Sequence, residues 1–227
     1  MDYFFRTTKN SHKIKYHKST FEKISQERRQ RIMNIAIAEF ATNGYNATNI
    51  NVIAKKAGIS IGSMYSYFAS KEDLFLTIVD MSFHILETAL YSIDIKEGNI
   101  FDILEKLLKT SRDYAIKYPE LNQIYLDVTT QGLSKFSNKL SHKLEEITAN
   151  LYLDILTSAK KNNIIDIDID THICSYCIDN LILMFQFSYT SDYYKERLKI
   201  FIGNNNIKDE EKIIAEIMKL LRKALTK

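Results

Sequence analysis

The residues whose types and spacing point most directly to chemistry lie in the segment GISIGSMYSYF, at positions 58–68. From Ile61 to Tyr67 it contains no Lys or Arg, although its surroundings are basic. Small side chains let a helix approach base edges in the major groove of DNA, and hydroxyl groups can donate to or accept from bases. The segment therefore predicts a helix that reads DNA.

A turn of 100° per residue divides residues 61–68 into two faces. Met64 and Phe68 share the face that we expect to pack inward. The opposite face consists mainly of small and hydroxyl side chains: Gly62, Ser63, Ser66 and Tyr67, with Ile61 and Tyr65 at its flank. We expect this opposite face to contact DNA.

Each side chain of the predicted DNA face has a chemical role. Gly62 costs roughly 1 kcal/mol in a helix relative to Ala, which suggests a close approach. Ser63 suits bases or phosphates, Ile61 suits a thymine methyl group, and Tyr65 and Tyr67 can place hydroxyls on phosphates. The alternative is that the tyrosines only pack and that Gly62 is merely tolerated.

Residues outside this segment add attraction to phosphate. Thr48 and Lys71 stand at predicted helix N-termini, where backbone N–H groups already favour phosphate. Lys55 and Lys56 add unspecific attraction, which predicts a salt-sensitive affinity. The predicted DNA-binding residues are Thr48, Lys55, Ser60, Ile61, Gly62, Ser63, Tyr65, Tyr67 and Lys71.

A second constellation is the pattern H-x-C-x-x-C formed by His172, Cys174 and Cys177. Residues i and i+3 of a helix share a face, so a metal edge or a redox pair is sterically feasible. The pattern supplies at most three ligands in apolar surroundings, which favours buried inert cysteines and no metal. A thiol- or metal-responsive regulator that uses Cys174 and Cys177 is the alternative.

Enzyme motifs are missing from the chain. There is no GxSxG, HExxH, P-loop or Gly-rich dinucleotide pattern, and 6 glycines leave few positions for phosphate cradles. We therefore expect a protein that is not an enzyme and has no cofactor. A further alternative is a helical scaffold whose N-terminal helices, near residues 22–70, no longer bind DNA. The intact Gly62, Tyr65 and Lys71 argue against this alternative.

The composition favours a helical protein of the cytoplasm. Among 227 residues there are 6 Gly and 1 Pro, fewer than a sheet protein with many tight turns needs. No apolar run has the length of a membrane span, no secretory signal is evident, and 2 cysteines fit a reducing compartment.

Charge is unevenly distributed along the chain. Residues 1–70 contain 11 Lys/Arg and 4 Asp/Glu, whereas residues 71–227 contain 20 and 24. A basic N-terminal part suggests that this end meets a polyanion. Chance clustering and a basic tail are the alternative explanation.

The elements that must position these residues are helices. Residues 1–21 have no clear period and predict a flexible basic arm. Ser25 caps a helix to about Asn43, which Gly44 ends. Thr48 caps a second, short helix, and after the break AGIS a third follows from Ser60 to Phe68. This arrangement is a helix-turn-helix, so we expect a DNA-binding domain at 22–70.

The remainder, 71–227, predicts a larger helical body. Its expected helices cover residues 71–94, 100–118, 120–131, 134–162, 171–189, 192–201 and 207–225. The run IIDIDID at 164–170 alternates like a strand but has no partner strand, so we interpret it as an extended loop. The expected fold class is all-α.

The segment TNINVIAKKAGISIGSMYSYFASKEDL at 48–74 resembles the DNA-binding head of the TetR family of bacterial transcriptional regulators. The matching positions are Thr48, Ile53-Ala54, Ala57-Gly58-Ile59-Ser60, Gly62, Met64-Tyr65, Tyr67-Phe68 and Ser70-Lys71-Glu72. With the ending Ala36 to Tyr45 of the preceding helix, the resemblance covers about 50 residues. Beyond residue 75 only the helical layout is similar.

The resemblance implies a body that dimerises and holds a small-molecule pocket. A homodimer on a palindromic operator in double-stranded DNA also follows from the few base pairs that one head reads. Helices 171–189 and 207–225 are the most apolar near the end and would form a four-helix bundle in the dimer; plain core helices are the alternative. The expected function is a repressor that a small, largely apolar effector releases from DNA.

Aromatic residues of the body are candidates to line a largely apolar pocket. They are Phe83, Tyr91, Phe101, Tyr114, Tyr125, Tyr152, Tyr176 and Phe185. For each of them ordinary core packing is the alternative. His84, Gln123 and Gln186 are polar groups that could orient a ligand there.

Overall fold

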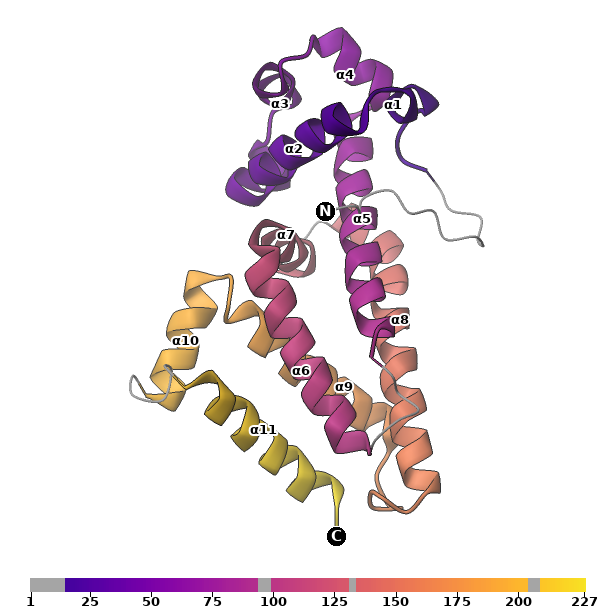
Figure 1. Ribbon diagram of the computed structural model, residues 1–227, viewed down its shortest axis with the longest axis vertical. Coiled ribbons are helices and arrows are strands. Elements are labelled where there is room, and N and C mark those ends of the chain that lie inside the picture. Colours follow the sequence, from indigo (N-terminus) through magenta and orange to yellow (C-terminus); the bar gives the residue numbers. More distant parts are fainter. Residues whose placement is uncertain (1–14, 94–98, 131–133, 204–208) are drawn as a thin grey trace. The chain divides into compact units, whose positions relative to one another are not determined.

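The computed structural model describes residues 15–93, 99–130, 134–203 and 209–227, with backbone alone at 91, 130 and 134–144. All its regular elements are α-helices (Figure 1). They are α1 Ser19–Lys23, α2 Gln26–Ala47, α3 Ile50–Ala57, α4 Ile61–Tyr67, α5 Lys71–Tyr91, α6 Ile100–Lys117, α7 Pro119–Thr130, α8 Ser134–Lys161, α9 Thr171–Phe187, α10 Asp192–Ile202 and α11 Glu210–Leu225. The all-α prediction is confirmed.

The chain divides into two compact units. The first contains residues up to Ile85 together with Gln123–Asp127, and the second contains Leu86–Asn122 and Val128–Lys227. The sequence-based boundary after residue 70 therefore differs from this division, because most of α5 belongs to the first unit.

The first unit is built around the side chains that α2 buries, among them Ile32, Ala36 and Phe40. Ser25 caps α2 as predicted, accepting from the Arg28 N–H at 3.3 Å. The helical conformation is interrupted at Gly44, whose φ is 69°. The sequence thus predicts the interruption correctly, although helical residues continue to Ala47.

The helix-turn-helix depends on a second left-handed glycine. Gly58 has φ +68° and ends α3, its N–H donating to the carbonyls of Ala54 and Lys55. A side chain at Gly58 would be strained at this φ, and its Cβ would lie 3.2 Å from a nitrogen of Arg31. This position accounts for the sharp turn between α3 and α4.

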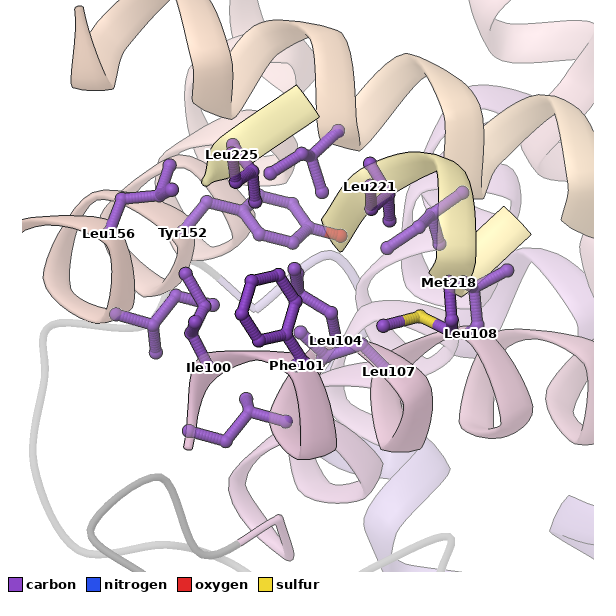
Figure 2. Packing of buried hydrophobic residues seen from close by; sticks show 14 of the residues in the cluster. Ile100, Phe101, Leu104, Leu107, Leu108, Tyr152, Leu156, Met218, Leu221 and Leu225 are labelled. Carbon is purple, nitrogen blue, oxygen red and sulfur yellow. The ribbon is translucent and has the colours of Figure 1, made fainter. Parts of the chain in front are cut away.

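The second unit contains a cluster of buried apolar side chains from α6, α8, α9 and α11 (Figure 2). Phe101, Leu104 and Leu108 of α6 pack there with Leu156 of α8 and Leu221 of α11. Asn99 starts α6 with a capping box that also uses Asp102. The apolar faces of α9 and α11 thus pack in the core of a single chain. This agrees with the alternative that both are plain core helices, and not with a four-helix bundle between two copies.

The segment 164–170 has no strand and forms turns between α8 and α9, so the loop interpretation is confirmed. Ile165 is buried, and the Asp166 N–H donates to the Leu225 carbonyl at 2.8 Å. The loop is therefore fastened to the end of α11. Of the described helices, none has the combination of length and apolar character that crossing a membrane requires.

Candidate nucleic-acid interface

The recognition helix, α4 at Ile61–Tyr67, has one buried side and one exposed side. Met64 and Phe68 are 0% exposed, so the predicted inward pair is confirmed. Ile61 and Tyr65 are 38% and 45% exposed. The exposed side of α4 therefore contains most of the predicted DNA face.

Tyr67 does not belong to that exposed side, and its predicted placement there is wrong. The side chain is 7% exposed, and its ring centroid lies 5.7 Å from that of Phe21. Phe21 comes from α1, a five-residue helix that is too short to show a period in the sequence. Tyr67 is therefore buried by an element that sequence reasoning missed.

Gly62 is exposed, and the fold leaves room for a side chain there. Among the described residues, a Cβ at this position would meet only the Ser60 hydroxyl oxygen, at 3.8 Å, which is ordinary van der Waals contact. Gly62 has no left-handed φ that would require glycine. In the part of the chain that the structure describes, neither packing nor backbone conformation explains why this helical position lacks a side chain.

Ser60 and Ser63 form the N-terminal end of α4. The Ser60 hydroxyl accepts from the Ser63 N–H at 3.0 Å, so the predicted cap is confirmed. The two hydroxyl oxygens also lie 2.9 Å apart and share a hydrogen bond. This pair presents hydroxyl groups beside Gly62 without any charge.

Thr48 is not the cap of α3, and this prediction is wrong. Asn49 is the cap, its side-chain oxygen accepting from the Asn51 N–H at 2.9 Å. The buried Thr48 hydroxyl donates instead to the carbonyls of Glu39 and Gly44, at 3.1 and 2.7 Å. The threonine thus closes the end of α2, and its hydroxyl is engaged inside the first unit.

Lys71 is also engaged within the first unit. Its Nζ donates to the carbonyls of Tyr45, Asn46 and Thr48 at 2.9, 3.2 and 3.0 Å. The ammonium group also lies 4.7 Å from the centroid of the Tyr45 ring. Lys71 therefore joins the start of α5 to the end of α2, where unsatisfied helix carbonyls attract a cation.

The two lysines of α3 differ in their surroundings. Lys56 pairs with Glu39 of α2, which offsets its charge. Lys55 is exposed, and its side chain makes no hydrogen bond or ion pair with the part of the chain that the structure describes. Of the two, Lys55 is the better candidate for contact with phosphate.

Part of the predicted basic arm belongs to the first unit. Residues 1–14 lie outside the described residues, but Lys18, Thr20 and Phe21 are bonded to or packed against α4. The arm prediction is therefore wrong for residues 18–21. A five-residue helix offers too few positions for the hydrophobic periodicity that would have revealed it.

The predicted pocket residues are not brought together into one described site. Phe83 and Tyr125 belong to the first unit, and the Tyr91 side chain lies outside the described residues. The second-unit residues Phe101, Tyr114, Tyr152 and Phe185 are all buried. Tyr176 is 69% exposed, so its prediction as a lining residue of an internal pocket is wrong.

Gln186, one of the polar groups proposed for the pocket, already has a hydrogen-bond partner within the second unit. Gln186 donates to the side-chain oxygen of Asn122, and Asn122 donates to the Thr190 hydroxyl at 2.6 Å. Asn122 is 0% exposed and Gln186 is 3% exposed. This chain of hydrogen bonds connects α7, α9 and the residues after α9.

His172, Cys174 and Cys177 are not arranged as the ligands of a metal site. Cys174 is half-buried, Cys177 is exposed, and both are free thiols. Burial and the neighbouring Cys177 raise the pKa of the Cys174 thiol, which disfavours the thiolate that binds metal or reacts. Within the described ranges, no three His, Cys, Asp or Glu side chains are grouped as metal ligands would be.

The helices and the exposed face of α4 define a helix-turn-helix protein. The model of the family described as "Bacterial regulatory proteins, tetR family" matches residues 32–78, from α2 into α5. AcrR, a transcriptional regulator of Shigella flexneri, is 40% identical over 58 residues, 26% of this chain and 27% of its own length. The head of the chain, at residues 32–78, therefore matches the TetR family of regulators.

Beyond the head, the chain is less similar to its relatives in sequence, although its fold is clearly shared with solved structures. YuxN, an uncharacterized HTH-type regulator of Bacillus subtilis, is 24% identical over 58% of this chain. The alignment with YuxN spans 45% of that protein, less than half of its length. These relatives are described as transcriptional regulators.

Two solved structures share the fold over most of the chain. A TetR family regulator from Chloroflexus aurantiacus has a TM-score of 0.70 at 18% identity, covering 93% of this chain and 99% of its own. FadR from Bacillus subtilis, solved in complex with stearoyl-CoA, has a TM-score of 0.61 at 20% identity, covering 85% and 96%. At these identities the similarity establishes the fold alone.

Proposed function

We propose that this chain is a DNA-binding transcriptional repressor that acts as a homodimer on a palindromic operator. A small, largely apolar effector releases it from the operator. The head reads DNA through the exposed face of α4, and the second unit pairs the two copies and binds the effector.

The observation that carries DNA binding is the exposed Gly62 in the first turn of the recognition helix. A glycine in a helix costs up to roughly 1 kcal/mol relative to alanine, and a Cβ at Gly62 would meet no atom of the described residues closer than 3.8 Å. A close approach to a DNA surface supplies the reason that the fold does not. Major-groove reading by a helix requires such an approach.

The other DNA contacts follow from exposure and chemistry. Ser60 and Ser63 offer hydroxyls, Ile61 offers an apolar contact for a thymine methyl group, and Tyr65 offers an exposed hydroxyl. Lys55 supplies charge to a phosphate. Because the side chains of Thr48, Tyr67 and Lys71 are engaged inside the first unit, we assign them to holding the helices that make these contacts.

Dimerisation is proposed on the outer side of α9. Ile173 and Tyr176 are 64% and 69% exposed, and Cys177 next to them is exposed as well. These residues are three and four positions apart and therefore share one side of the helix. Pairing two such sides would cover apolar area that a single chain leaves in water.

The proposed effector site lies in the second unit, where buried aromatic side chains provide an apolar lining. Phe101, Tyr152 and Phe185 come from three helices and meet in one cluster. Stearoyl-CoA, the ligand of the FadR complex, is a suitable first probe because its acyl chain matches an apolar lining. Release of the protein from DNA by stearoyl-CoA, and not by free coenzyme A, would support an apolar effector.

DNA binding is tested by selecting duplexes from a random 30-base-pair library with the full-length protein. We expect a palindromic sequence to emerge and to bind with strong salt dependence. Failure to enrich any sequence would contradict the proposed function. The selected duplex then serves as the probe for variants.

Gly62→Ala separates the DNA reading of α4 from its stability. We expect the melting temperature to stay the same or to rise, because alanine is the better helix former, while affinity for the selected duplex falls at least about tenfold. Fluorescence anisotropy titration and thermal denaturation give the two numbers. Wild-type affinity in Gly62→Ala would remove the argument that this glycine permits a close approach to DNA.

A further inference from the structure

The C-terminal end of the recognition helix is bonded to a segment that lies far from it in sequence. The Tyr65 carbonyl accepts from the Lys18 Nζ at 2.8 Å, and the Tyr67 carbonyl accepts from the Lys18 backbone N–H at 2.8 Å. Between them, the Ser66 carbonyl accepts from the Thr20 hydroxyl. The last carbonyls of a helix have no hydrogen-bond donor within it. Here residues 18 and 20 provide three donors to such carbonyls.

The charge of Lys18 suits this position. The C-terminal end of a helix carries partial negative charge, so a cation there is stabilising. α4 itself has no basic residue in its last turn. The ammonium group of Lys18 therefore places a positive charge at the C-terminal end of α4, where the helix has no basic residue of its own.

Packing reinforces these hydrogen bonds. Phe21 is 1% exposed, and its ring centroid lies 4.7 Å from that of Phe68. On the other side, Arg29 of α2 donates to the carbonyls of Glu22 and Ile24 at 2.6 and 2.8 Å. The end of α4 is thus connected through α1 to the start of α2.

We infer that Lys18, Thr20 and Phe21 are positioning residues for DNA recognition, acting as a cap that holds α4 from its C-terminal end. The name "trans cap" denotes these three residues. A helix of seven residues is marginal without tertiary support, and its exposed face must stay in one orientation to read bases. This inference rests on the proposed DNA-binding function.

A competing role for Lys18 is direct contact with a phosphate, since its side chain is exposed. The two roles differ in salt dependence. Loss of one phosphate contact reduces the slope of log affinity against log salt by about 0.9. Loss of a positioning residue lowers affinity at every salt concentration and leaves the slope unchanged.

The first experiment uses the free protein and needs no DNA. Amide hydrogen exchange is compared for wild type, Lys18→Met, Thr20→Val and the control Lys23→Met. Lys23 is an exposed residue of α1 whose side chain makes no hydrogen bond or ion pair with the described residues. We expect exchange at residues 64–68 to become about fivefold faster in Lys18→Met and Thr20→Val. Unchanged exchange there would overturn the trans cap.

The second experiment measures affinity for the duplex selected by the wild-type protein over a range of salt concentrations. We expect Lys18→Met and Thr20→Val to bind about fivefold more weakly with an unchanged slope, and Lys18→Arg to restore affinity. Equal losses in Lys18→Met and Lys23→Met, or a reduced slope, would overturn the positioning role. If wild type selects no duplex, the proposed function fails, and hydrogen exchange still decides whether the cap holds α4.

Discussion

At the scale of single residues, the first unit assigns several side chains of the family motif to its own stability. Thr48, Tyr67 and Lys71 match the motif, yet each is directed inward, toward helix carbonyls or into the core. Gly62 differs from them because no contact among the described residues requires a glycine there. Residues of one motif therefore divide into those that hold the helices and those that stay exposed for the proposed DNA contacts.

Lys71→Met should destabilise the first unit. The Lys71 ammonium donates to three carbonyls, and hydrogen bonds to a charged group contribute about 2 kcal/mol to stability. We expect a lower melting temperature and faster hydrogen exchange around residues 44–50. Lys55→Met is the matched control, in which duplex affinity and its salt dependence fall while the melting temperature stays unchanged. Unaltered stability in Lys71→Met would show that the ammonium contributes little there.

At the scale of elements, helix ends are where sequence reasoning and structure differ most. Asn49 rather than its neighbour Thr48 caps α3, since the hydroxyl of Thr48 reaches back to the end of α2. Both residue types are good caps, so sequence alone ranks neither. The choice depends on the tertiary position of α2 relative to α3.

An acidic residue on α9 makes the stability of this element pH-dependent. Burial raises the pKa of Asp179 from its usual value to about 6. Between about pH 4 and pH 6 the folded chain therefore binds a proton at Asp179 that the unfolded chain does not.

The sign of this effect follows from proton linkage. Where the folded state binds more protons, stability falls as pH rises, so Asp179 reduces stability as pH rises from about 4 to 6. We expect Asp179→Asn to melt higher than wild type at pH 7, with the gap shrinking toward pH 4. Thermal denaturation at pH 4, 5, 6 and 7 measures the gap. A constant gap over this range would contradict the raised pKa.

At the scale of the whole molecule, the proposed homodimer depends on apolar residues that one chain leaves exposed. The inner faces of α9 and α11 are used in the core of the second unit, so they are not available for pairing copies. The outer side of α9 retains Ile173 and Tyr176. Two heads on a palindrome require such a pairing.

Tyr176→Glu should disrupt the homodimer without unfolding the chain, because the ring is 69% exposed in one chain. Placing a charge in an apolar interface leaves it desolvated and unpaired. We expect a monomer in sedimentation velocity and weaker binding to the palindromic duplex. Ile116→Glu is the control, because Ile116 is 56% exposed on α6. A stable dimer of Tyr176→Glu would place the interface elsewhere.

The sequence by itself determined the all-α class, the helix-turn-helix at 48–68, the inward pair Met64 and Phe68, and the resemblance of the head to the TetR family. These features depend on local spacing, capping and backbone conformation, which neighbouring residues encode. Only the tertiary structure decided that Tyr67 is buried, that Lys71 binds carbonyls and that residues 18–21 cap α4. Those contacts join residues far apart in the chain, and no local pattern specifies which distant partner a side chain meets.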